Sequence, residues 1–198
     1  MYSFAISQGV VYVGSYDGSV YAIAFASGKL LWRYDTKGRA LNPEDFGFDR
    51  RSILSSPSVT DGVVYIGSRD AHLYAVDAAK GTLRWLRDYE KDNMTWANSS
   101  PAVRDGVVYT GTSYGGFVHA LRTADGHELW RFKMPSRVWA SPSIAGSNLY
   151  ITNQSGDLYA VDAVTGKETW HVQPERARCA RRGAAQKQTV KRPSSLCP

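Results

Sequence analysis

The sequence contains no apolar run that approaches the length of a membrane-spanning helix. Such a helix needs about 20 consecutive, predominantly apolar residues, so we expect no membrane span. The amino end has no basic region followed by an apolar segment, and no secretory signal is expected within this chain. Only two cysteines are present, Cys179 and Cys197, both near the carboxyl end. Two thiols in a segment poor in large apolar residues exclude a disulfide framework for the fold.

The chain also lacks net charge outside its carboxyl segment. Residues 174–198 hold seven basic side chains and one acidic, which is +6 and equals the formal net charge of the whole chain. The other 173 residues hold 17 side chains of each sign, which is 0. A neutral body removes the electrostatic argument for nucleic-acid binding. We expect 174–198 to be a disordered basic tail that is solvated, binds acidic surfaces, or results from a non-native reading frame.

What the sequence does contain is a repeat. An eleven-residue frame occurs four times, with Ala first, Gly seventh and Trp last. Its tryptophans are 53, 45 and 40 residues apart, and a period of this length indicates a repeat architecture. The structural residues of the four frames are Gly28 and Trp32, Gly81 and Trp85, Gly126 and Trp130, and Gly166 and Trp170.

Each copy predicts four short strands. An apolar run around a tyrosine precedes every frame, as in Val63-Val64-Tyr65-Ile66-Gly67, and Ser-Pro precedes three of these runs. Short runs rich in Val, Ile, Tyr and Trp, separated by turn pairs such as Asp-Gly, are hairpin signals. Four such strands at this period are typical of a β-propeller blade, with its Trp between adjacent blades. We expect an all-β propeller with four-stranded antiparallel blades at about 1–35, 55–89, 99–133 and 140–173.

The repeat frame resembles that of the PQQ-like (quinoprotein-type) β-propellers, Ala-x-Asp-x-x-Thr-Gly-Lys-x-x-Trp. The fourth copy matches this frame in full, at Ala160, Asp162, Thr165, Gly166, Lys167 and Trp170. The resemblance implies a propeller of seven or eight blades, of which four are present here. Four copies close as a small ring, pair with a second chain, or are a fragment of a larger propeller. We expect the fragment, a partial ring whose open blade edges tend to associate.

The resemblance implies two classes of function. The first is a non-catalytic binding, scaffold or ligand-sensing module with a protein partner, similar to the lipoprotein scaffold of bacterial outer-membrane assembly, and located in the cell envelope. The second is a fragment of a PQQ-dependent alcohol or sugar dehydrogenase, with PQQ and calcium as cofactors. We favour the first, because the sequence has no Cys-Cys pair and no convincing set of calcium ligands. We therefore assign no catalytic residue and expect no cofactor.

Functional residues are expected where the copies differ. The first joint between copies carries an insertion, 37–51, which is either a lid or partner contact, or a solvated and tolerated loop. Two tryptophans also lie outside the repeat frame, before the strand-opening prolines. With nearby polar residues they form a candidate funnel for an aromatic or anionic ligand, or they pack under the loops. The candidates are Arg51, Trp96, Asn98, Arg137 and Trp139.

No metal site is predicted. The four histidines are scattered without the spacing of metal ligands. His119 takes the place of the repeat tyrosine, so we expect it to be packed inside its blade. The carboxylates of Asp45, Asp49 and Asp92 are interpreted as surface charge.

Overall fold

The computed structural model describes residues 3–90 and 96–173. The basic tail at 174–198, with both cysteines, and Asp92 lie outside the described residues. Within the described ranges, regular structure consists of β-strands and two short 3-10 helices, η1 (Lys37–Ala40) and η2 (Pro43–Asp45). No helix in this part of the chain is long and apolar enough to cross a membrane.

The strands form four antiparallel sheets, each made of four consecutive strands. The first sheet contains β1 (Phe4–Ser7), β2 (Val10–Gly14), β3 (Ser19–Ala24) and β4 (Leu30–Asp35). The second contains β5 (Ser58–Thr60), β6 (Val63–Gly67), β7 (His72–Asp77) and β8 (Leu83–Asp88). The third contains β9 (Ala102–Arg104), β10 (Val107–Thr112), β11 (Phe117–Arg122) and β12 (Glu128–Lys133). The fourth contains β13 (Ser143–Ala145), β14 (Asn148–Thr152), β15 (Leu158–Asp162) and β16 (Glu168–Val172).

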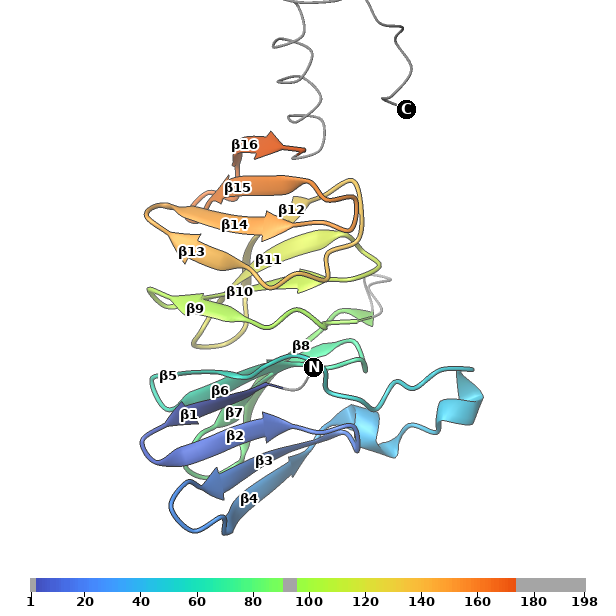
Figure 1. Ribbon diagram of the computed structural model, residues 1–198, viewed down its shortest axis with the longest axis vertical. Coiled ribbons are helices and arrows are strands. Elements are labelled where there is room, and N and C mark those ends of the chain that lie inside the picture. The colour runs from blue at the N-terminus through green and yellow to red at the C-terminus, as the bar shows by residue number, and fades with distance from the viewer. Residues whose placement is uncertain (1–2, 91–95, 174–198) are drawn as a thin grey trace, which may run out of the picture.

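The sheets follow one another in chain order along the long axis of the molecule, with β1–β4 at one end and β13–β16 at the other (Figure 1). Their first strands lie side by side, since β1 contacts β5, β5 contacts β9, and β9 contacts β13. This arrangement confirms the predicted propeller of up-and-down blades. The first and last blades lie at opposite ends, so the described residues form a partial ring.

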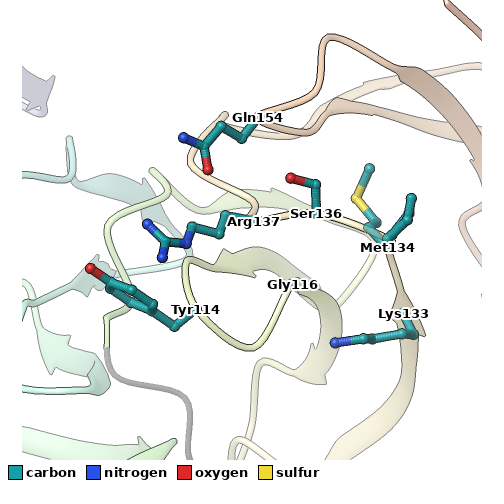
Figure 2. A pocket seen from close by; sticks show the side chains of 8 residues that line it. Tyr114, Gly116, Lys133, Met134, Ser136, Arg137 and Gln154 are labelled. Atoms are coloured by element: carbon teal, nitrogen blue, oxygen red, sulfur yellow. The ribbon is translucent and has the colours of Figure 1, made fainter.

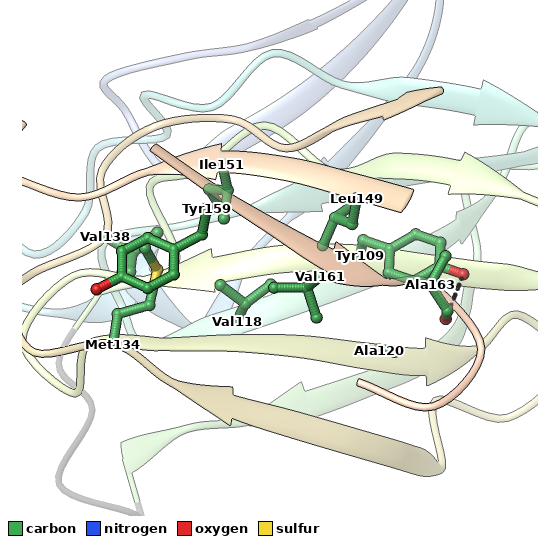
Figure 3. Packing of buried hydrophobic residues seen from close by; sticks show 10 residues of the cluster. All are labelled: Tyr109, Val118, Ala120, Met134, Val138, Leu149, Ile151, Tyr159, Val161 and Ala163. Atoms are coloured by element: carbon green, nitrogen blue, oxygen red, sulfur yellow. Dashed lines mark hydrogen bonds between the residues drawn. The ribbon is translucent and has the colours of Figure 1, made fainter. Parts of the chain in front are cut away.

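Apolar residues on both faces of the sheets form the interfaces between blades. The strand β6 is buried at every position, which explains why its sequence does not alternate between apolar and polar residues. Figure 3 shows the cluster between the third and fourth blades, where Val118 and Val161 face each other and Tyr109 reaches Ala163. The Tyr109 hydroxyl donates a hydrogen bond of 3.1 Å to the Ala163 carbonyl.

The repeat tryptophan joins each blade to the next. In each of the first three blades the indole N–H of this tryptophan donates a hydrogen bond to a carbonyl of the following blade. That carbonyl lies in the turn between the third and fourth strands. The bonds run from Trp32 to Ala78 (2.9 Å), from Trp85 to Thr123 (2.8 Å) and from Trp130 to Ala163 (3.1 Å). The repeat glycine of that turn lies against the ring. We call this combined contact the tryptophan lock.

Only glycine fits beneath the indole. A Cβ atom at Gly81, Gly126 or Gly166 would lie 2.6 Å from the ring of the locking tryptophan, closer than Cβ atoms pack. These glycines also have φ of +69°, +71° and +70°, a left-handed conformation that other residues adopt at an energetic cost. The repeat glycine therefore serves both the turn and the contact between blades.

The fourth tryptophan differs from the other three. Trp170 is 40% exposed, whereas Trp85 is 8% exposed. We expected each repeat tryptophan to lie between adjacent blades, and this expectation is wrong for Trp170. The reason is geometric, because no blade follows the fourth within the described residues.

Candidate functional site

The segment that enters each of the last three blades passes beside the turn between the second and third strands of that same blade. Three backbone hydrogen bonds repeat this contact, with the turn N–H donating to the entering segment. They run from Arg69 to Ser52 (3.1 Å), from Ser113 to Trp96 (3.0 Å) and from Gln154 to Arg137 (2.8 Å). Trp96 and Arg137 therefore occupy equivalent places at two successive joints, which brings their side chains to the same end of the blades.

At this end of the blades two arginines flank a pair of aromatic rings. The guanidinium carbon of Arg69 lies 4.4 Å from the centre of the Trp96 ring. Trp96 meets Tyr114 edge-on, with ring centres 4.9 Å apart, and the guanidinium carbon of Arg137 lies 4.1 Å from the centre of the Tyr114 ring. We call Arg69, Trp96, Tyr114 and Arg137 the arginine–aromatic row. Stacking on an aromatic face leaves the edge of a guanidinium free to donate hydrogen bonds to a ligand.

A cavity of about 500 Å³ adjoins the row between the third and fourth blades. Figure 2 shows Arg137 directed toward the Tyr114 ring, with Gln154 beside it and Lys133 across the cavity. The cavity is lined by Tyr114, Gly116, Lys133, Met134, Pro135, Ser136, Arg137 and Gln154. None of these residues is acidic, and two are cationic. The lining therefore suits an anionic or carbonyl-rich ligand.

Several polar atoms at the row are buried and have no hydrogen-bond partner among the described residues. They are the Nε atom of Arg69, the indole Nε1 of Trp96 and the Oδ1 atom of Asn98. A buried polar group left unpaired costs about 1–3 kcal/mol, and such groups are usually satisfied by protein, water or ligand. Unpaired donors of Arg69 and Trp96 and an unpaired acceptor of the nearby Asn98 therefore lie just beneath the surface at the row.

The insertion 37–51 is docked on two blades at its start. The Gly38 N–H donates to the Asp70 carboxylate (2.7 Å), and the Lys37 N–H donates to the Tyr74 hydroxyl (2.9 Å). Arg39 pairs with Asp17 of the first blade at 2.9 Å. The interpretation as a solvated loop is therefore wrong for the start of the insertion, because these contacts hold it against the blades.

The Asp70 carboxylate is the buried anchor of this docking. Burial by itself would raise the pKa of Asp70, but hydrogen bonds from His72 and Tyr74 outweigh it and hold the pKa below its usual value. The later part of the insertion extends toward the row, with the Phe48 ring 5.6 Å from the Trp96 ring. An aromatic side chain of the insertion thus lies beside the row.

The predicted site residues do not all come together. Trp96 and Arg137 join the row, and Asn98 follows Trp96 in the same entering segment. Arg51 instead contacts the neighbouring carboxylate of Asp49, with 3.6 Å between Nε and Oδ1. Trp139 is 46% exposed. It stands three residues before its strand-opening proline, as Asn98 does, and so occupies the position of Asn98 and not that of Trp96.

Sequence reasoning missed Arg69, Tyr114 and Phe48. Counted back from the third strand of each copy, Arg69 and Tyr114 share one turn position, where the other copies have Tyr16 and Gln154; counted forward from the second strand, the longer third turn places Ser113 there. Comparing this position across the four copies would have pointed to them. Phe48 had no such signal, because the insertion has no counterpart in the other joints.

His119 is fully buried in the third blade. Its Nδ1 atom lies 2.9 Å from the Glu128 carboxylate, and its ring lies 4.8 Å from that of Tyr89. Burial lowers the pKa of His119, although Glu128 acts in the opposite direction. Within residues 3–90 and 96–173, no three His, Cys, Asp or Glu side chains group closely enough to hold a metal ion.

Comparison with known proteins gives a family match over nearly all of the chain. The family model described as "Outer membrane protein assembly factor BamB" matches residues 2–130 and 93–192. The chain is 29% identical to tetrathionate hydrolase of Acidithiobacillus ferrooxidans over 138 residues, 58% of this chain and 27% of that protein. It is 25% identical to BamB of Moranella endobia over 171 residues, 81% of this chain and 41% of that protein. It is 28% identical to quinohemoprotein alcohol dehydrogenase ADH-IIG of Pseudomonas putida over 173 residues, 83% of this chain and 24% of that protein.

Solved structures share the fold. BamB of Moraxella catarrhalis superposes with a TM-score of 0.66 at 20% identity, covering 86% of this chain and 48% of that one. Quinohemoprotein alcohol dehydrogenase of Comamonas testosteroni superposes with a TM-score of 0.74 at 21% identity, covering 86% of this chain and 34% of that one. The chain thus spans less than half the length of these relatives.

His119 makes the stability of the protein depend on pH. The pKa of His119 is lower in the folded state than the unfolded value of about 6.5, so the unfolded state binds more protons between the two values. The free energy of unfolding should therefore fall as the pH falls below about 6.5. Urea unfolding at about pH 7.5 and about pH 5.5 measures this change.

Replacing His119 with Tyr, the residue of the other copies, should reduce the loss of stability between these two pH values. His127→Gln, which removes an exposed histidine of the same blade, should leave the loss as it is. An equal pH dependence in His119→Tyr and the unmodified chain would contradict the assignment.

Proposed function

The chain belongs to the family described as outer membrane protein assembly factor BamB, and from this premise we propose that it is a non-catalytic, protein-binding propeller module. The observation that carries this proposal is the arginine–aromatic row, because it gathers cations and aromatic faces from successive blades. Aromatic residues and arginine are enriched where proteins bind one another. Blades hold the row on a rigid support, which reduces the entropy lost on binding.

The chemistry of the row favours a partner segment with carboxylates and aromatic side chains. Arg69 and Arg137 each stack on a ring and keep donor edges for carboxylates. The lining of the adjoining cavity adds Lys133 and no acidic residue. The half-exposed ring of Phe48 extends the apolar surface beside Trp96. An extended peptide that alternates carboxylate and aromatic side chains matches these features.

The second candidate is a fragment of a PQQ-dependent dehydrogenase. The relationship to ADH-IIG favours it, since this match covers 83% of the chain. Among the described residues no three acidic, histidine or cysteine side chains group closely enough to hold a metal ion, so these side chains give its calcium ion no support. The buried carboxylate of Asp70 is already occupied by Gly38, His72 and Tyr74. We therefore keep this reading second and propose no catalytic step.

Peptide binding tests the proposed module. The probe is a short, fluorescently labelled peptide of alternating Asp and Tyr, and the comparison peptide has Asn in place of each Asp. Fluorescence anisotropy should show tighter binding of the Asp peptide. Arg137→Ala and Trp96→Ala should each weaken this binding by about tenfold or more, the loss expected for residues that dominate an interface.

The matched control is Arg122→Ala, which removes the same charge from the third blade at an exposed ion pair with Asp125. This variant should bind the Asp peptide as the unmodified chain does. Equal weakening in Arg122→Ala and Arg137→Ala would reduce the effect to general charge attraction and contradict a specific site, as would equal binding of the two peptides.

A cofactor titration separates the two candidate functions. PQQ and calcium are added to the chain with an alcohol or a sugar and a redox dye. The binding module should leave the dye oxidised at every cofactor concentration. Dye reduction that requires the protein, PQQ and calcium together would contradict the non-catalytic proposal and support the dehydrogenase.

A further inference from the structure

The two ends of the partial ring carry complementary halves of the tryptophan lock. Three complete locks lie between the four blades, and each uses a tryptophan from one blade and a turn from the next. The fourth blade has the tryptophan and the first blade has the turn. Each of these halves is without its partner within the described residues.

The donor half lies on the fourth blade. Trp170 packs beside Tyr150 with ring centres 5.9 Å apart, close to the 5.8 Å between Tyr109 and Trp130 in a complete lock. In that complete lock both side chains donate to the Ala163 carbonyl. The indole of Trp170 is 40% exposed, so this preformed pair faces outward from the last blade.

The acceptor half lies on the first blade. Gly28 has φ of +67°, and its N–H donates to the Ala24 carbonyl at 2.9 Å, as the Gly81 N–H does to Asp77. A Cβ at Gly28 would meet nothing within 4 Å, whereas one at Gly81 would strike the Trp32 ring. The carbonyl equivalent to that of Ala78 belongs to Phe25, whose ring is also exposed. The turn therefore has the conformation of a complete lock and open space above it.

Other contacts between blades also have complementary halves at the two ends. The Ser56 N–H donates to the Ser100 hydroxyl (2.8 Å), and the Ser100 N–H donates to the Ser141 hydroxyl (3.0 Å). Continuing this series would pair the Ser141 N–H with the hydroxyl of Ser3. Arg87 in the last strand of the second blade pairs with Glu128 in the last strand of the third (3.2 Å). The residues at the equivalent positions of the fourth and first blades are Val172 and Leu30, and both side chains are exposed and apolar.

We propose that two copies of this chain associate head to tail, with Trp170 of each copy locked on the Gly28 turn of the other. Two identical contacts related by a two-fold axis close a ring of eight blades, twice the four sheets of one chain. Each contact repeats the geometry of the three interfaces inside the chain and covers the exposed apolar residues at both ends. This association is independent of the binding function proposed above.

The occupant to which we commit for the exposed face of the fourth blade is a second copy, because its first blade carries the Gly28 turn and the exposed apolar residues that complement this face. At Gly14, Gly67 and Gly111 a Cβ would lie 2.5 Å or less from atoms of the segment that enters the next blade. The corresponding residue of the fourth blade is Thr152, which has a side chain at this place. A segment that followed the same course past the fourth blade would meet this side chain.

Sedimentation velocity and light scattering on the 198-residue chain test the proposal. The expected mass is twice 21.9 kDa, which is 43.8 kDa. Trp170→Ala and Gly28→Ala should each raise the dissociation constant at least tenfold, because the first removes the indole and the second places a methyl group beneath it. Urea unfolding of each variant checks that the monomer remains folded.

The matched control is Gly9→Ala. Gly9 has φ of +74°, and a Cβ added there would meet no atom within 4 Å. The same is true of its counterpart Gly62 in the second blade, which packs against a neighbouring blade, so this position lies outside the contact between blades. The control therefore carries a similar backbone strain without entering the contact, and it should leave the dimer unchanged. Mixing Trp170→Ala with Gly28→Ala should restore a dimer, because one intact Trp170 then meets one intact Gly28 turn.

Three results would overturn the proposal. The first is a monomer at the highest soluble concentration. The second is a dimer lost in Trp170→Ala and kept in Gly28→Ala, since two fourth blades would then face each other. The third is a series of species that grows with concentration, because head-to-tail contacts that do not close produce open chains.

Discussion

The structure depends on one repeated contact, in which an indole of one blade lies on a glycine of the next and donates to a nearby carbonyl. A blade of four short strands has two apolar faces and cannot bury both alone. The lock places a large ring, such as that of Trp85, against the backbone of the neighbouring turn. The same contact explains why the chain is built of similar units and why its two ends carry exposed apolar residues.

The rigid stack of blades positions the arginine–aromatic row. Trp96 and Arg137 lie at equivalent joints, and Arg69 and Tyr114 at equivalent turns, so the spacing between blades sets the spacing along the row. The insertion adds a further ring, since its start is bound to the buried Asp70 and its later part brings Phe48 to Trp96. Differences between copies thus create the site on a support that the copies share.

The sequence predicts the fold well because strands, turns and locks depend on residue types that recur at fixed positions in every copy. It predicts the site less completely. Trp96 and Arg137 both stand five residues before a strand-opening proline, so their common register could be counted, but Trp139 stands three before and does not share it. The contacts of Arg69 and Tyr114 arise between residues distant in the chain, and no local pattern reveals them. The exposure of Trp170 follows from the absence of a fifth blade among the residues that the structure describes, which the repeat of Trp170 itself cannot reveal.

A double-mutant cycle on Trp130 and Gly166 tests the tryptophan lock most directly. Gly166→Ala should destabilise the protein both by backbone strain and by displacing the indole, whereas in the Trp130→Ala background only the strain remains. Urea unfolding should therefore give a coupling energy of about 1–2 kcal/mol between the two positions. Effects that add to within about 0.3 kcal/mol would mean that the indole and the glycine act independently, and would contradict the lock as the contact that holds the blades together.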